Sequence, residues 1–88
     1  MRYQVFVSKK VLKSAAKMPG KVKAAFALLL DDLAEDGPEQ PEWHNYSALN
    51  EGRYHCHLAY HWVACWTWEK GTISIEVYYA GSRENAPY

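Results

Sequence analysis

Apolar residues recur along the first half of the chain in a pattern that predicts one strand and two helices. Four of the residues 2–7 are the β-favouring Tyr3, Val5, Phe6 and Val7, which predicts a strand. Ser8 is a suitable N-cap, and apolar residues then follow at helical spacing as far as Met18. Pro19-Gly20 ends this helix, and a second, longer apolar stripe runs to Gly37-Pro38. The pattern therefore predicts a strand followed by an antiparallel helical hairpin.

The second half of the chain reads as a loop followed by three strands. Residues 37–52 are rich in Pro, Gly, Asn and Glu, which predicts a loop. Three β-favouring runs come next, at Arg53–Ala59, Trp62–Trp68 and Thr72–Tyr79. A tail follows from residue 80. The order β-α-α-β-β-β predicts one α+β domain over residues 1–88, with the helical hairpin on one face of an antiparallel sheet.

The other face of this sheet stays uncovered, and strand alternation predicts which side chains it carries. With a turn centred on Tyr60-His61, Cys56 lies opposite Cys65, and both face the helices together with Val63. The intervening side chains then point outward, where a half-buried sheet usually carries ordinary polar residues. Here they are histidine, arginine and large aromatic residues, namely Arg53, His55, His57, Trp66, Trp68 and Tyr78.

Two histidines form the centre of this open face. His55 and His57 lie on the same side of one strand, about 6–7 Å apart. Either imidazole can take up or release a proton near neutral pH, and Arg53 can contact a phosphate. The same residues also fit a plain solvated face. A metal site is a further reading, but a lone His-x-His lacks the third and fourth ligands of zinc, so we expect no metal and no cofactor.

The aromatic residues of the open face allow three interpretations. Trp66, Trp68 and Tyr78 can stack on nucleobases, as aromatic side chains do in single-stranded RNA recognition. They can instead pack across strands, or form an apolar patch that binds a protein partner. Cys56 and Cys65 leave two readings as well: a cross-strand disulfide, or the buried free thiols expected in a reducing compartment.

Composition excludes several classes of protein. The 88 residues are 49% hydrophobic and 15% aromatic, which excludes a disordered chain. The longest apolar run, residues 24–30, is far shorter than the roughly 20 residues of a membrane span. The first residues carry no secretory signal, and two cysteines are too few for a disulfide scaffold. We therefore expect a cytoplasmic protein with no membrane contact.

The formal net charge is zero, but the charges are unevenly distributed. Residues 1–30 contain seven Lys and Arg and no acid, whereas residues 31–52 contain seven Asp and Glu and no base. A zero sum argues against a uniformly basic nucleic-acid binder. The separation by position is compatible with a charged binding face, and also with ordinary solvated helix faces.

Several short segments, in their order and spacing, match a known family. They are Tyr3–Ser8, Leu12–Pro19, Gly37-Pro38, Asn45–Leu49, Tyr54–Leu58, Val63–Trp66 and Val77–Tyr88. These segments resemble the RelE/ParE superfamily of bacterial toxins, and the resemblance covers essentially the whole chain. The segments Tyr54–Leu58 and Val63–Trp66 look like the RelE branch in particular.

The resemblance implies the toxin of a type II toxin–antitoxin pair, with a cognate antitoxin as partner. A RelE-type toxin cleaves messenger RNA on the ribosome, without a metal, and leaves a 2′,3′-cyclic phosphate. By position, Arg83 would hold the scissile phosphate and Tyr88 would orient or stack on a base. His55 or His57 would transfer protons, with Arg53 as a second phosphate contact.

Two alternatives stay open within this resemblance. A ParE-type toxin would inhibit DNA gyrase instead of cleaving RNA. A catalytically decayed homologue would still bind its antitoxin. The second is suggested by Ala48, which stands before Leu49 where the family often has Lys.

Overall fold

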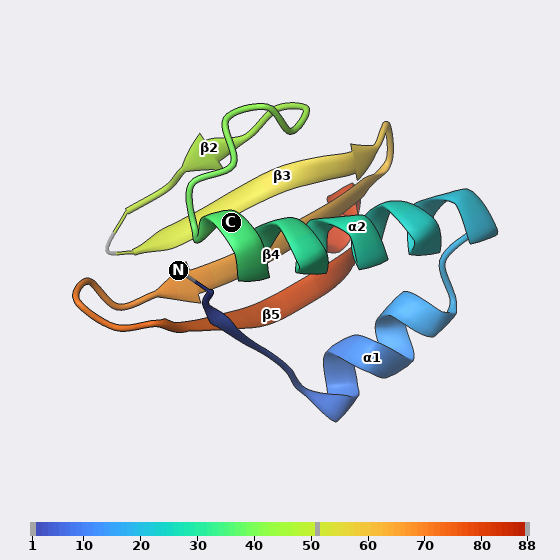
Figure 1. Cartoon of the computed structure of the whole chain (residues 1–88). Helices are drawn as coiled ribbons and strands as arrows, with labels where there is room; N and C mark the ends of the chain where they lie inside the picture. Colours follow the sequence, from blue (N-terminus) through green and yellow to red (C-terminus); the bar gives the residue numbers. More distant parts are fainter. Residues whose placement is uncertain (1, 51, 88) are drawn as a thin grey trace.

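The computed structural model describes residues 2–50 and 52–87, and it confirms the α+β architecture, with two helices on a five-stranded, mostly antiparallel sheet (Figure 1). The elements are β1 (Gln4–Val7), α1 (Lys9–Ala16), α2 (Gly20–Asp36), β2 (Ser47–Ala48), β3 (Arg53–Ala59), β4 (Trp62–Trp68), β5 (Ser74–Ser82) and the short 3-10 helix η1 (Arg83–Asn85). The strand order is β1-β5-β4-β3-β2, and within the described residues β1 runs parallel to β5 while the other neighbours are antiparallel.

The start of α1 and the end of α2 each have a local cause in the sequence. The Ser8 hydroxyl accepts a hydrogen bond from the backbone N–H of Val11 at 3.2 Å, which caps α1. Gly37 ends α2 at a φ of +91°, a backbone conformation that glycine adopts without strain. A Cβ at this position would also lie 2.8 Å from the ring of Tyr3, so glycine is required there on two grounds.

The helix α2 supplies one side of the core. Its buried stripe consists of Val22, Phe26, Leu29 and Leu33, as the spacing predicted. Figure 1 shows α2 lying across the sheet, while α1 lies beside β5. Within residues 2–50 and 52–87, no helix is long and apolar enough to cross a membrane.

Trp66 is the largest fully buried side chain of the core. Its indole N–H donates a hydrogen bond to the backbone carbonyl of Pro38 at 3.0 Å. Its ring stacks on Tyr54 and Tyr46, with centroid separations of 6.1 and 6.4 Å. These contacts join the sheet to the segment that follows α2.

The predicted pairing of β3 with β4 is correct next to the turn, at Ala59 and Trp62, and wrong by one residue from His57 onward. His57 pairs with Val63 and Ala59 pairs with Trp62, so the turn contains an irregularity between His57 and Ala59. Because side chains alternate along a strand, a slip of one residue moves every side chain of β4 to the other face. Val63 and Cys65 therefore lie on the open face.

The same slip overturns the predicted position of two tryptophans. Trp66 has no exposed surface and packs under α2, so it cannot stack on an RNA base. Trp68 also lies on the helix side, where it packs against the core and its indole N–H donates to the carbonyl of Thr72 at 2.9 Å. Neither residue belongs to the open face.

The sequence also missed a strand and misplaced an end. The two-residue strand β2 lies inside residues 37–52, which were predicted to form a loop. It pairs with Tyr54 and His55 of β3. β5 continues to Ser82 instead of stopping at Tyr79. Ala80 and Gly81 favour strands poorly, but a Cβ at Gly81 would lie 2.9 Å from the Tyr79 hydroxyl, so close packing requires a small residue there.

The two cysteines are free, buried and on opposite faces of the sheet. Cys56 pairs with Ala64 in the core, whereas Cys65 pairs with His55 on the open face. A cross-strand disulfide is therefore excluded by direction. Burial raises the pKa of the Cys56 thiol to about 12 and that of Cys65 to about 11, so both thiols stay protonated at neutral pH.

Candidate functional site

Three histidines gather on the open face of the sheet. His55 and His57 project from β3 with their ring centroids 6.0 Å apart. His44, from the loop before β2, brings its ring to 6.1 Å from that of His57. The backbone N–H of His57 donates to the carbonyl of His44 at 2.8 Å, which fastens this loop to β3.

Asn45 completes the contact between the loop and the histidines. Its backbone has a φ of +52°, a left-handed conformation that Asn tolerates better than most residues. Its side-chain amide nitrogen lies 3.5 Å from Nδ1 of His57. Because an amide nitrogen can only donate, this contact suits a neutral imidazole that carries its proton on Nε2.

The surroundings of His57 favour its neutral form. Burial lowers the pKa of His57, and the nearby His55, His44 and Arg83 lower it further because a second positive charge would be repelled. An imidazole that stays neutral at pH 7 can accept a proton from a substrate. His57 is therefore the best candidate for a general base on this face.

We expect Arg83→Gln to raise the pKa of His57, because the substitution removes a cation that disfavours the imidazolium. The rise is only partial, since burial is the larger cause. An NMR titration of the histidine Cε1–H resonances measures the shift. Lys70→Gln, at the exposed turn after β4, is the matched loss of charge and should leave the value unchanged; a fall or no change in Arg83→Gln would contradict the assignment.

The sign of the accompanying stability effect follows from linkage. The folded pKa of His57 lies below the ordinary value of about 6.5, so the unfolded chain binds more protons in this range. The neutral form of His57 therefore contributes to the free energy of unfolding at pH values above about 6.5. This contribution is lost as the pH falls from about 6.5 towards the folded pKa.

Arg83 is the first residue of η1, and it lies near enough to His57 to affect the pKa of that imidazole. Its backbone N–H donates to the carbonyl of His61 at 2.7 Å, and its guanidinium lies 5.4 Å from the centre of the Tyr60 ring. The turn between β3 and β4 thus holds this cation at the edge of the open face. The structure brings together three of the predicted residues, His55, His57 and Arg83.

Two further predicted residues lie on the same face. Arg53 is exposed at the start of β3, and its charge reaches Tyr78 on β5. A side-chain hydrogen bond links Tyr78 to Cys65, and burial raises the pKa of Tyr78. Tyr88, the last predicted site residue, lies outside the described residues.

The described residues contain no group of three or more His, Cys, Asp and Glu placed to hold a metal ion. The imidazoles of the three histidines can transfer protons and form hydrogen bonds, and Arg83 and Arg53 are fixed positive charges near them.

Known structures share this architecture. The chain matches no family model, and no curated protein matches it. The RelE–RelB complex from the archaeon Pyrococcus horikoshii is 17% identical over 98% of this chain and 100% of that one, with a TM-score of 0.76. A mutant of the E. coli toxin RelE in the free state is 16% identical, over 96% of this chain and 86% of that one, with a TM-score of 0.72. The fold is that of the RelE toxins.

A third structure with the RelE fold is the E. coli DinJ–YafQ toxin–antitoxin complex. It is 15% identical over 96% of each chain, with a TM-score of 0.68. The TM-scores establish the RelE fold. Because the sequence identities are low, the activity has to be argued from the side chains.

His44 and Asn45 were not predicted from the sequence as site residues of this RelE fold. A weak signal was present, since Trp43, His44 and Asn45 stand together in a segment otherwise rich in Pro and Glu. The position of a loop over a sheet depends on tertiary contacts, such as the hydrogen bond from the Trp43 indole to the Asp32 carboxylate at 2.9 Å. Alternation along strands carries no information about such contacts.

Proposed function

We propose that this chain is the toxin of a type II toxin–antitoxin pair and cleaves messenger RNA on the ribosome. The observation that carries the proposal is the cluster of His44, His55 and His57 beside Arg83 on the open face of a RelE fold. Proton-transferring groups next to a fixed cation are what phosphodiester cleavage requires.

The proposed reaction is attack of a ribose 2′-hydroxyl on the neighbouring phosphorus. Neutral His57 accepts the 2′-hydroxyl proton at Nδ1, where the substrate hydroxyl replaces the 3.5 Å contact of the Asn45 amide, while the bond from the 2′-oxygen to phosphorus forms. The bond from phosphorus to the 5′-oxygen breaks, and His55, acting as an imidazolium, is the candidate to donate a proton to that oxygen and become neutral. The products are a 2′,3′-cyclic phosphate and a free 5′-hydroxyl. Atoms and charge balance with these side chains alone.

Arg83 supplies the electrostatic part of the proposed mechanism. The guanidinium would neutralise the charge that develops on the phosphate oxygens in the transition state. Arg53, at the other end of β3, would hold a second phosphate of the RNA. With so few fixed cations on this face, the ribosome would position the substrate, and a ribosomal target implies action in the cytoplasm.

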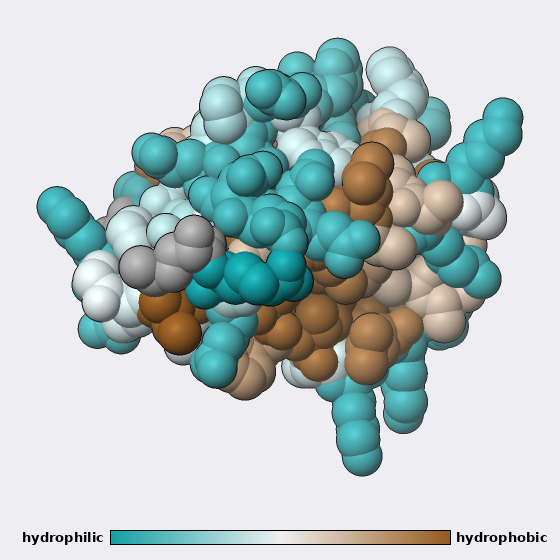
Figure 2. Space-filling model, in the orientation of Figure 1, coloured by the Kyte–Doolittle hydropathy of each residue, from teal (hydrophilic) through white to brown (hydrophobic). Residues whose placement is uncertain are grey.

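The helix-covered side is the proposed site for the antitoxin. The exposed side chains of Leu12 and Leu28, 52% and 56% accessible, lie on α1 and α2. Figure 2 shows hydrophobic surface between these helices, among hydrophilic side chains. The two helices and the residue that ends α1 carry Lys9, Lys13, Lys17, Lys21 and Lys23. An amphipathic acidic segment of an antitoxin fits this combination.

Neither alternative gains support from the geometry. The similar structures named above are RelE and YafQ toxins, which gives a gyrase inhibitor no support. Ala48 removes a cation that the family often carries, whereas the three clustered histidines beside Arg83 favour an active enzyme over a decayed homologue.

Mapping of transcript 5′ ends tests the proposal. Inducing this chain alone in bacterial cells should stop growth and produce new 5′ ends within translated regions, in phase with the codons. Blocking translation initiation should remove these ends. Intact transcripts in arrested cells would contradict the nuclease, and a loss of negative supercoiling under the same conditions would indicate gyrase as the target.

A further inference from the structure

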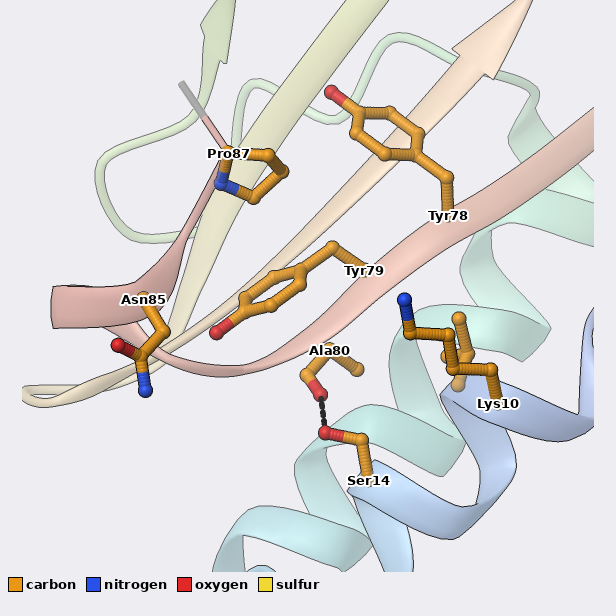
Figure 3. A pocket seen from close by; sticks show the side chains of 8 residues that line it. Lys10, Ser14, Tyr78, Tyr79, Ala80, Asn85 and Pro87 are labelled. Carbon is orange, nitrogen blue, oxygen red and sulfur yellow. Dashed lines mark hydrogen bonds between the residues drawn. The ribbon is translucent and has the colours of Figure 1, made fainter.

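A cavity of about 350 Å³ lies beside the candidate site, between α1, β5 and the C-terminal tail (Figure 3). Its lining side chains are Lys10, Val11, Ser14, Tyr78, Tyr79, Ala80, Asn85 and Pro87. The volume is at the lower end of the range for small-molecule sites, roughly 300–1,000 Å³. It therefore suits one compact group better than a folded segment.

The cavity exists because β1 stops before β5 does. β1 pairs with β5 only as far as Val7, opposite Val77. Beyond this point α1 takes the place of a neighbouring strand, and the Ser14 hydroxyl donates to the carbonyl of Ala80 at 2.7 Å. A helix cannot follow a strand edge as closely as a strand does, so space is left between them.

A bulge turns two consecutive tyrosines towards this space. Trp66 pairs with Val77 and Cys65 pairs with Tyr79, so Tyr78 is an extra residue in β5. In a regular strand Tyr78 and Tyr79 would point to opposite faces, but a bulge redirects the side chain. Both rings therefore line one cavity, and Figure 3 shows them diverging from β5 with Pro87 across from them.

The charge of the lining favours an anionic ligand. Lys10 extends its ammonium group from α1 towards β5 (Figure 3), and no carboxylate stands among the described lining residues. Asn85 contributes an amide, which offers both a donor and an acceptor to the edge of a base. Aromatic rings, an amide and one cation together match a nucleotide.

The cavity and the histidine cluster lie along the same row of the sheet. His55 pairs with Cys65, and Cys65 pairs with Tyr79, so these three residues form one row across the sheet. Two strand spacings separate His55 from Tyr79, about 10 Å. A single strand of RNA held over the histidines would reach the cavity with a neighbouring nucleotide.

We propose that this cavity binds the nucleotide next to the cleaved bond, with its base against Tyr78 and Tyr79, its base edge at Asn85 and its phosphate at Lys10. The identity of that nucleotide as part of messenger RNA rests on the proposed function. The cavity would give the enzyme its preference for one base beside the cut.

NMR of the purified full chain tests the site with nucleoside 5′-monophosphates as probes. Each of AMP, CMP, GMP and UMP is titrated in turn, and the expected shifts fall on the backbone amides of Ser14, Ala80 and Asn85. Lys10→Glu should weaken binding by about tenfold, the value of one charge-assisted contact. Asn85→Ala should reduce the differences between the four bases.

Lys9→Glu is the matched control, since it makes the same charge change one residue earlier on α1 and lies outside the cavity lining. Equal weakening in both variants, or shifts away from the lining, would overturn the proposal. So would a hexaglutamate peptide that shifts the same amides where nucleotides do not, because the cavity would then take a protein.

These measurements need neither ribosome nor antitoxin, so the two proposals fail separately. Nucleotide binding without any transcript cleavage would overturn the nuclease and leave the cavity assignment standing. Codon-phased cleavage without nucleotide binding at the lining residues would do the reverse.

Discussion

Replacement of His57 by alanine is expected to lower the rate of messenger RNA cleavage by about 10²- to 10⁴-fold, the usual contribution of a general base. His57 contacts the loop through Asn45 and stands among His44, His55 and Arg83, so its removal takes away the best-placed proton acceptor. The measurement is single-turnover cleavage of a messenger bound to purified ribosomes. Far-UV circular dichroism checks that the variant remains folded.

His61→Ala is the matched control for His57→Ala. His61 is exposed in the turn between β3 and β4, and its ring contacts Tyr60 at 4.5 Å instead of the histidine cluster. It should cleave at close to the wild-type rate. Undiminished cleavage by His57→Ala, or an equal loss in both variants, would show that the proton acceptor lies elsewhere.

The pH profile separates a catalytic His57 from a structural one. Cleavage should fall as the pH drops below the lowered pKa of His57, because the protonated imidazole can no longer accept the 2′-hydroxyl proton. In His57→Ala the remaining activity should lose this acid limb. A variant that merely destabilised the fold would keep the limb at a lower rate.

The second large effect is expected in the core. Trp66→Ala should lower the free energy of unfolding by about 3–5 kcal/mol, as large aromatic deletions in cores do. The ring is fully buried, it stacks on Tyr54 and Tyr46, and its N–H satisfies the Pro38 carbonyl. Small domains are stable by only about 5–15 kcal/mol, so the variant should be close to unfolding.

Urea denaturation followed by circular dichroism measures this effect and its parts. Trp66→Phe keeps an aromatic ring but strands the Pro38 carbonyl, which should cost about 1–3 kcal/mol. Tyr60→Ala, with 71% of the side chain exposed, should change the free energy of unfolding by no more than about 0.5 kcal/mol. An open-face Trp66 would give the opposite outcome: near-normal stability in Trp66→Ala with weaker RNA binding.

Local patterns predicted the elements well. The bounds of β3 and β4, Arg53–Ala59 and Trp62–Trp68, are the ones predicted from the sequence. The buried stripe of α2 and its end at Gly37 also follow from spacing and from glycine chemistry. These features depend on residues close together in the chain, where sequence is most informative.

The register between β3 and β4 could not be predicted in the same way. Alternation reads the same whether Cys65 or Ala64 lies opposite Cys56, since both residues are small and fit a buried strand. The irregularity after His57 decides the outcome, and it depends on how the turn closes over the sheet. This shift of the register by one residue places Trp66 in the core and Cys65 beside His55 on the open face.

The separation of the two thiols by the sheet gives the molecule a pair of natural reporters. Cys56 meets a labelling reagent only when the helix layer lifts away from the sheet. Cys65 needs only the displacement of side chains such as Tyr78 on the open face. The thiol that reacts first under native conditions therefore shows which opens more often, the core under the helices or the candidate catalytic face. The experiment uses the two natural cysteines, so no cysteine has to be introduced by mutation.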